Sequence, residues 1–207
     1  MSRYTDPKCR LCRREGVKLF LKGQRCETVK CPIQRRNSTP GVHVWRRGKA
    51  SEYGLQLREK QKTKRFYGVF ERQFRTLYAK ASMRKGNTGE YLLLLLERRL
   101  DNVITILGLA QSRSQARQMI AHRHIRLNGK PITRQSVLVR KGDVISVATR
   151  EKTKKLLEVN LAVFTREIPM WLSRDRDATQ GVVLALPTRK DVSIEVNEQL
   201  IVELLAK

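Results

Sequence analysis

The sequence lacks the hydrophobic segments that membrane-spanning and secreted proteins carry. Its longest apolar run extends from Tyr91 to Leu96 and closes at Glu97, far short of the roughly 20 residues that a transmembrane helix requires. The N-terminus has no apolar core of the kind found in secretory signals. There is also no lipidation signal and no basic amphipathic helix that would favour a membrane surface. These absences predict a soluble cytoplasmic protein in a reducing compartment.

Sequence motifs typical of enzymes are missing as well. There is no Gly-rich phosphate-binding loop and no constellation of paired carboxylates. Asp175, Asp177 and Asp191 lie in polar, turn-like sequence. Internal repeats and low-complexity tracts are also absent. We therefore expect no enzyme and no small-molecule substrate.

Acidic residues are scarce. The chain has 19 Asp and Glu against 44 Lys and Arg, a net charge of +25, and its pI is near 10.7. So many positive charges in a compact chain repel one another unless a polyanion neutralises them. Nucleic acid is the polyanion that fits best. Residues 1–90 carry 24 Lys and Arg against 7 acids, and residues 91–207 carry 20 against 12. We expect the first part of the chain to make more of the phosphate contacts.

Cysteine is absent beyond residue 31. The four cysteines are Cys9, Cys12, Cys26 and Cys31. Two close pairs joined by a short loop suit four thiolates around a tetrahedral ion, and the basic residues between them favour the thiolate form. Zinc is the first choice and an iron–sulfur cluster the second. Two disulfides, which are rare in a reducing cytosol, or four unconnected thiols are the alternatives. A metal here would fold a segment too small and too basic to fold alone.

The most regular apolar pattern begins at Leu93. Apolar residues recur at three and four residues from Leu93 to Leu107, which predicts one helix that ends at Gly108. Ser112-x-x-Gln115 matches a capping box and predicts the start of a second helix. On the outer face of that helix, Arg113 and Arg117 lie one turn apart and are expected to point outward together.

A short strand and a tight turn follow the second helix. Ile125-Arg126-Leu127 alternates like a strand, and Asn128-Gly129 predicts a two-residue hairpin turn, because a type I′ turn needs positive φ at both positions. The product is a helix-loop-helix-strand unit with a basic rim.

The remaining periodicities predict further helices and short strands. Asn87 and Asn197 are expected to cap helices, and an aromatic stripe between Tyr67 and Ala81 is expected to lie in a core. Further helices are expected over residues 51–64 and 151–163, and strands over residues 137–139, 144–147, 181–186 and 192–196.

The helix-loop-helix-strand unit resembles the small RNA-binding module named after the fourth protein of the bacterial small ribosomal subunit, the S-four domain. Other runs extend the resemblance over nearly the full length and occur in that family's order. They are Leu19-Phe20-Leu21-Lys22, Tyr53 to Lys62, Arg72-Gln73-Phe74-Arg75, Lys85 to Glu90, and Asn197 to Leu204. The chain thus resembles that ribosomal protein family, in its cysteine-containing, metal-binding variant; other members lack most of the cysteines.

The resemblance implies an α+β fold. A mainly helical domain formed by the N- and C-terminal parts would carry an inserted S-four domain of two helices on a small sheet, preceded by a four-Cys metal knuckle. The implied boundaries are 1–45 for the metal-binding extension, 46–96 for the helical rRNA-binding domain, 97–175 for the S-four domain, and 176–207 for a C-terminal segment packing on the helical domain.

The resemblance also implies a structural constituent of the small ribosomal (30S) subunit. Such a protein binds 16S rRNA early, nucleates assembly of the subunit body and contributes to translational accuracy. Its implied partners are 16S rRNA, messenger RNA where it enters the subunit, and neighbouring proteins, notably the fifth of the small subunit. Arg46, Arg47 and Lys49 are expected at the messenger RNA channel. The expected rRNA contacts are Arg58, Lys60, Lys62, Arg72, Arg75, Arg84, Lys85, Arg98, Arg99, Arg113, Arg117, His122, Arg123 and Arg126.

Two other readings use the same module. It occurs in some pseudouridine synthases, which modify RNA, but those enzymes need a separate catalytic domain with a nucleophilic Asp, and too few residues follow the module here. An RNA-binding heat-shock or rescue factor would be expected to be shorter and to lack the N-terminal runs.

Overall fold

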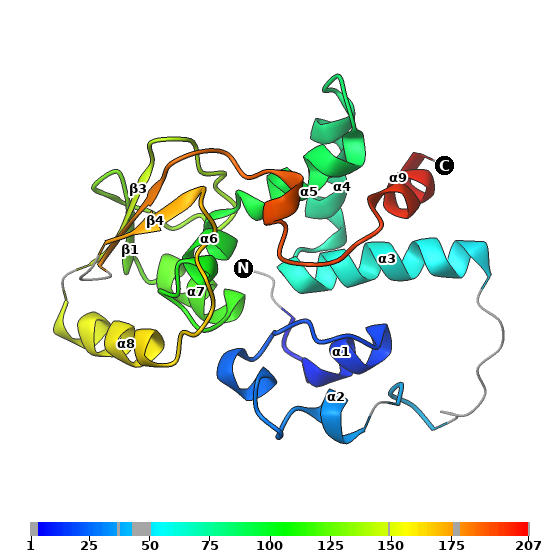
Figure 1. The fold of residues 1–207 in the computed structure, drawn as a ribbon, viewed down its shortest axis with the longest axis horizontal. Coiled ribbons are helices and arrows are strands. Elements are labelled where there is room, and N and C mark those ends of the chain that lie inside the picture. Colours follow the sequence, from blue (N-terminus) through cyan, green and yellow to red (C-terminus); the bar gives the residue numbers. More distant parts are fainter. Residues whose placement is uncertain (1–3, 37, 43–50, 149, 176–178, 207) are drawn as a thin grey trace. The chain divides into compact units, whose positions relative to one another are not determined.

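The computed structural model describes residues 4–36, 38–42, 51–148, 150–175 and 179–206, and these divide into two compact units (Figure 1). Unit 1 comprises residues 1–93 and 193–207, and unit 2 comprises residues 94–192. No helix within the described ranges combines the length and apolar character needed to cross a bilayer.

Unit 1 contains the helices of the N-terminal part and the last helix of the chain. They are α1 (Cys9–Glu15), the 3₁₀ turn η1 (Gly23–Cys26), α2 (Pro32–Arg35), α3 (Glu52–Tyr67), α4 (Glu71–Ser82), the first part of α5 (Thr88–Glu97), and α9 (Glu198–Ala206).

Unit 2 contains a small sheet and its helices. They are the end of α5, α6 (Leu100–Ile106), α7 (Arg113–Ala121), β1 (Ile125–Leu127), β2 (Lys130–Pro131), β3 (Val144–Val147), α8 (Glu151–Ala162), β4 (Leu172–Arg174), β5 (Gln180–Val183) and the 3₁₀ turn η2 (Arg189–Asp191).

Helix α3 is the longest helix described in unit 1, and α9 lies beside it (Figure 1). Ser51 caps α3 by accepting a hydrogen bond from the Gly54 amide at 3.1 Å, and Gly68 ends it in the left-handed conformation at φ 63°. The amide of Gln56 on α3 donates to the Glu203 carboxylate on α9 at 3.1 Å. The helix that closes the chain is therefore tied to α3 by a polar bond as well as by packing.

The predicted caps of α5 and α9 are confirmed. The Asn87 side-chain oxygen accepts from the Gly89 amide at 3.0 Å, and that of Asn197 accepts from the Gln199 amide at 3.2 Å. A Cβ atom at Gly89 would stand 2.8 Å from the Glu198 Cβ atom. A glycine is therefore needed at this position for α5 to approach α9.

Much of the predicted aromatic stripe is confirmed as core. Tyr67 is 1 % exposed and Phe74 0 % exposed, and Leu77 and Ala81 are also buried. Phe70 differs, with 40 % of its surface exposed. It occupies the N-cap position of α4 in an extended conformation, so its side chain lies outside the helical stripe.

The sheet of unit 2 is antiparallel, with strand order β2-β1-β3-β5-β4. Helices α6, α7 and α8 contribute to the same core as the sheet, in which Leu107, Ile120, Ile145 and Trp171 are buried. The predicted turn chemistry is confirmed: Asn128 and Gly129 both have positive φ, and the Ser112 hydroxyl caps α7 by accepting from the Gln115 amide. Gly108 follows α6 at φ 76°, as predicted for a residue that ends a helix.

The prediction of one continuous helix from Leu93 to Leu107 is wrong. Helix α5 ends at Glu97 and α6 begins at Leu100. Arg99 is extended, with φ −67° and ψ 135°, and forms an isolated β-bridge with Leu138. Of the strand predicted over residues 137–139, the structure forms only this isolated bridge at Leu138. No strand forms at 192–196, a stretch that the structure describes in full.

Lys60 and Lys64 of α3 both form ion pairs with Glu71, the first residue of α4. The Lys60 ammonium donates to the Glu71 carboxylate at 2.6 Å, and the Lys64 ammonium donates to its other oxygen at 2.9 Å. Burial by itself would raise the pKa of Glu71, but the two lysine hydrogen bonds outweigh it and lower that pKa from 4.5 to about 2. Glu71 is therefore ionised throughout the range in which the protein would work.

These ion pairs predict a pH dependence of stability. The pKa of Glu71 is lower in the folded than in the unfolded chain, so its contribution is present above pH 4.5 and is lost as the pH falls toward about 2. In the Glu71→Gln variant, the urea midpoint should fall less steeply between pH 4.5 and about pH 2 than in the parent chain.

The control for this test is Glu151→Gln on α8. Glu151 pairs with Lys155 at 3.8 Å, and its side chain is 86 % exposed. Exposed pairs of this kind contribute little, so the acid dependence of this variant should match the parent chain. Equal slopes for Glu71→Gln and the parent chain would contradict the prediction.

Candidate nucleic-acid interface

Two arginines share one buried carboxylate at the start of α6. Asp101 is 0 % exposed. Its Oδ1 and Oδ2 atoms accept from Nε and Nη2 of Arg99, both at 3.1 Å, and Oδ2 also accepts from Nε of Arg117 at 2.7 Å. We refer to Arg99, Asp101 and Arg117 as the Asp101 cluster. It ties α7, through Arg117, to the first turn of α6.

The next residue of α6 makes a parallel arrangement. The Asn102 amide donates to the backbone oxygen of Glu97 at 3.0 Å and to the Glu97 carboxylate, and its Oδ1 atom accepts from Nε of Arg113 at 2.8 Å. Asn102 and Glu97 are both 0 % exposed. Consecutive residues of α6 therefore each hold one arginine of α7.

These contacts change the expected picture of α7. Arg113 and Arg117 were predicted to project from an exposed helix face, but both are partly buried and bonded to α6. Arg99, which was expected to contact RNA, is 2 % exposed and bound to Asp101. A buried guanidinium cannot reach a phosphate, so this placement gives Arg99 a structural role.

Exposed cations form a rim after α7. Arg123, at φ 59°, and Arg126 on β1 are exposed, as is His122. The His122 and His124 rings stack with centroids 6.1 Å apart, and His124 Nδ1 lies 3.1 Å from the Thr153 hydroxyl. Burial, together with the charges of Arg150 and His122, lowers the pKa of His124. His124 is therefore biased toward its neutral form, and the exposed arginines supply fixed positive charge to the rim.

Sequence reasoning missed several exposed cations of unit 2. Lys130, Arg134, Arg140 and Arg150 are exposed beyond the helix-loop-helix-strand unit. They lie in or between the sheet strands, where no helical spacing draws attention to them. Arg98 was expected to contact RNA; its Nε atom donates to the Val139 backbone oxygen at 3.0 Å, which leaves the side chain partly exposed.

In unit 1, exposed cations gather on α4 and just after it. Arg72, Arg75, Arg84 and Lys85 are exposed. The Arg84 guanidinium lies 4.4 Å from the centre of the Tyr91 ring, a cation–π distance that orders the side chain. These four side chains are accessible to a phosphate backbone, as predicted from the sequence pattern.

Several basic residues of α3 form ion pairs with carboxylates of unit 1. Lys60 is 6 % exposed against Glu71, so its expected contact with RNA is replaced by a structural pair. Lys62 donates to Glu59 at 2.7 Å, and Arg58 donates to Glu15 of α1 at 3.3 Å.

Glu15 is a second shared carboxylate. Its side chain is 1 % exposed and is bonded to both Arg58 and Arg65. Burial raises the pKa of Glu15, and the charges of Arg65, Arg58 and Arg14 oppose that shift. The carboxylate joins α1, which carries Cys9 and Cys12, to α3.

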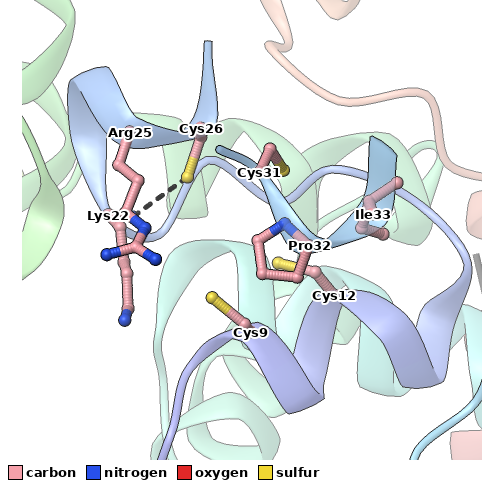
Figure 2. A pocket seen from close by; sticks show the side chains of 8 residues that line it. All are labelled: Cys9, Cys12, Lys22, Arg25, Cys26, Cys31, Pro32 and Ile33. Atoms are coloured by element: carbon pink, nitrogen blue, oxygen red, sulfur yellow. Dashed lines mark hydrogen bonds between the residues drawn. The ribbon is translucent and has the colours of Figure 1, made fainter. Parts of the chain in front are cut away.

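The four cysteines line one pocket in unit 1 (Figure 2). Lys22, Arg25, Pro32 and Ile33 line it as well. No disulfide joins these four cysteines, and the Lys22 amide donates to the Cys26 sulfur at 3.4 Å. We call Cys9, Cys12, Cys26 and Cys31 the thiol pocket. Its location shows that the two sequence pairs, separated along the chain, meet in space.

The thiol pocket offers four sulfur atoms that could bind a metal ion, but the side chains do not surround a common centre. Burial raises the pKa of Cys12 to about 11, and the neighbouring cysteines add to this shift. A bound cation would reverse that effect, because it stabilises the thiolate directly. Among the described residues, no three ligating side chains are placed as they stand to hold a metal ion. Four sulfurs around one pocket nevertheless match the chemistry of zinc or of an iron–sulfur cluster.

The basic loop that was predicted to meet messenger RNA cannot be placed. Arg46, Arg47 and Lys49, with the neighbouring His43 and Trp45, lie outside the residues that the structure describes.

Comparison with known proteins covers the whole chain. The family model described as the ribosomal protein S4/S9 N-terminal domain matches residues 3–97, and the S4 domain model matches residues 98–145. Small ribosomal subunit protein uS4 of Thermoanaerobacter pseudethanolicus is 54 % identical over 207 residues, and that of Pelobacter propionicus is 55 % identical over 210 residues. Protein uS4A of Symbiobacterium thermophilum is 52 % identical over 207 residues. In all three cases the similarity spans 100 % of both chains. The chain therefore belongs to the uS4 family of small ribosomal subunit proteins.

Proposed function

We propose that this protein is a structural constituent of the small ribosomal subunit in the cytoplasm, where it binds 16S rRNA early and nucleates assembly of the subunit body. The observation that carries this proposal is full-length similarity to relatives named small ribosomal subunit protein uS4. The exposed cations of α4 and of the rim after α7 support it, because they are available to a polyanion.

RNA binding would work through backbone contacts and shape. Arginine and lysine contacts to phosphate supply affinity and fix the register of the protein on RNA. The deep major groove of A-form RNA is poorly read by side chains, so specificity would come from the shape of a folded RNA. The alternatives of an RNA-modifying enzyme and of a heat-shock or rescue factor find no support in the full-length uS4 similarity.

The first test of this proposal is the salt dependence of RNA binding. With several phosphates neutralised, affinity for a 16S rRNA transcript should fall by orders of magnitude between low and physiological salt. Arg123→Ala and Arg126→Ala should each weaken binding and reduce the slope of log K against log salt by about 1.

The matched control is Lys155→Ala. Lys155 is an exposed cation on α8 that pairs with Glu151 at 3.8 Å and lies outside the expected contact set. Its slope should equal that of the parent chain. A flat salt titration of the parent chain would count against RNA binding through phosphate contacts.

We further propose that the thiol pocket holds one structural zinc ion, with an iron–sulfur cluster as the alternative. Cys9, Cys12, Cys26 and Cys31 would be the ligands. The support is that all four cysteines line one pocket and that no disulfide joins them. A metal there would supply folding free energy to the N-terminal segment and no reaction chemistry.

The metal proposal predicts a local effect of cysteine loss. Cys26→Ser should abolish metal binding and disorder roughly the first forty residues, while unit 2 stays folded. Hydrogen exchange and elemental analysis of the same sample measure both effects. Val29→Ser is the control, because Val29 lies between Cys26 and Cys31 and is 79 % exposed. The proposal fails if the parent protein, purified without chelator under reducing, oxygen-free conditions, contains neither zinc nor iron.

A third proposal concerns messenger RNA, neighbouring proteins and accuracy. We infer from the family resemblance that the loop with Arg46, Arg47 and Lys49 faces the channel where messenger RNA enters the subunit. Cations on such a loop can hold separated phosphate backbones and favour single strands over a duplex. Contact with the fifth protein of the small subunit and a contribution to translational accuracy belong to the same inference.

Replacing Arg46, Arg47 and Lys49 together by Ala tests the loop. We expect normal subunit assembly and slower elongation through a stable messenger RNA hairpin, since fewer cations would hold the separated strands. Assembly is measured by sedimentation and passage by single-turnover translation of hairpin and unstructured messages. Impaired assembly with unchanged passage would instead assign these residues to ribosomal RNA.

A further inference from the structure

We propose that Asp101 and Asn102 are positioning residues for RNA binding: they hold Arg117 and Arg113 in the conformation that receives phosphate and do not touch RNA themselves. The inference rests on the proposed binding of 16S rRNA and assigns a role to two residues of the S4 module that carry no positive charge.

The first argument is burial. Asp101 and Asn102 are both 0 % exposed, so neither can contact a macromolecule at the surface. Arg113 and Arg117 are partly buried, and each places its Nε atom on one of these two residues, at 2.8 Å and 2.7 Å. Consecutive residues of α6 are thus bonded to residues one turn apart on α7.

The second argument is that Asp101 has a complete partner without Arg117. Nε and Nη2 of Arg99 donate to the two carboxylate oxygens of Asp101, both at 3.1 Å, which is the bidentate arrangement that satisfies a carboxylate. Arg99 is buried with it at 2 % exposure. The contact from Arg117 is additional to this pair, so Asp101 can orient Arg117 while Arg99 compensates the buried charge.

The third argument is that hydrogen bonds and packing fix α6 within unit 2. The Leu100 amide donates to the Val137 backbone oxygen at 2.8 Å, and the Thr105 hydroxyl donates to the Asp101 backbone oxygen at 2.9 Å. Leu100 and Val103, on either side of the two polar residues, are 0 % exposed. A side chain bonded to this helix therefore takes up its fixed position.

Positive charge survives the pairing. The Asp101 cluster joins two guanidinium groups to one carboxylate, so its net charge is +1. An arginine ordered before binding loses less conformational freedom when phosphate arrives. We expect loss of the anchor to weaken RNA binding by about three- to tenfold for each arginine.

A double-mutant cycle tests whether Asp101 acts through Arg117. The dissociation constant for a 16S rRNA transcript is measured for the parent chain, Asp101→Asn, Arg117→Ala and the double variant. Asp101→Asn should weaken binding by about three- to tenfold in the parent chain and have almost no further effect once Arg117 is Ala. A purely structural role would weaken binding equally in both backgrounds, and that result would overturn the proposal, as would no effect in the parent chain.

Arg126→Ala provides the matched background. Arg126 is an exposed cation on β1 with no described bond to Asp101, so Asp101→Asn should keep its full effect there. Failure of the parent chain to bind the transcript would refute the proposed function itself, whereas binding with additive effects refutes only the positioning role.

A second cycle applies if Asp101→Asn does not fold, as judged by thermal unfolding. It combines Asn102→Ala with Arg113→Ala, which leaves the buried pair of Arg99 and Asp101 intact. The expected result is again a loss with Arg113 present and almost none with Arg113 replaced. Equal losses in both backgrounds refute the proposal.

Discussion

The carboxylate of Asp101 is the constraint around which unit 2 is arranged. A carboxylate removed from water is costly unless charged donors surround it, and breaking such a pair leaves an uncompensated buried charge. Arg99 supplies the bidentate partner, and to do so it leaves the helical path and bridges to Leu138. This one buried group thus lies where α5 gives way to α6 and where Arg117 joins α7 to α6.

Three carboxylates in the described part of this very basic chain each bind more than one cation. Glu15 binds Arg58 and Arg65, Glu71 binds Lys60, Lys64 and Arg75, and Asp101 binds Arg99 and Arg117. Each shared carboxylate joins two segments of its own unit. With 19 acids for 44 bases, the chain keeps a net charge of +25 for an external polyanion. Lys60 and Arg99 are buried by such pairs, whereas Arg75 and Arg117 keep part of their surface exposed.

The N-terminal segment depends on two attachments of different chemistry. The thiol pocket gathers α1, η1 and the start of α2, a stretch with few apolar side chains to hold it. Glu15, at the end of α1, connects that stretch to Arg58 and Arg65 of α3 through a buried carboxylate. Metal binding at the proposed site would stabilise the first attachment, and ion pairing stabilises the second.

The sequence by itself determined the features that depend on neighbouring residues: the caps at Ser112, Asn87 and Asn197, the turn at Asn128-Gly129, the close cysteine pairs and the basic excess. Local hydrogen bonds and φ preferences decide the caps and the turn, and residue order and composition alone give the cysteine pairs and the basic excess. Only the tertiary structure decided that the apolar run from Leu93 breaks at Arg99, and that Arg99 and Lys60 are buried pairs instead of RNA contacts. The reason is that helical periodicity in the sequence indicates only which face of a helix is apolar. Whether a charged side chain is buried or exposed depends on a partner such as Asp101 or Glu71, which folding brings close to it.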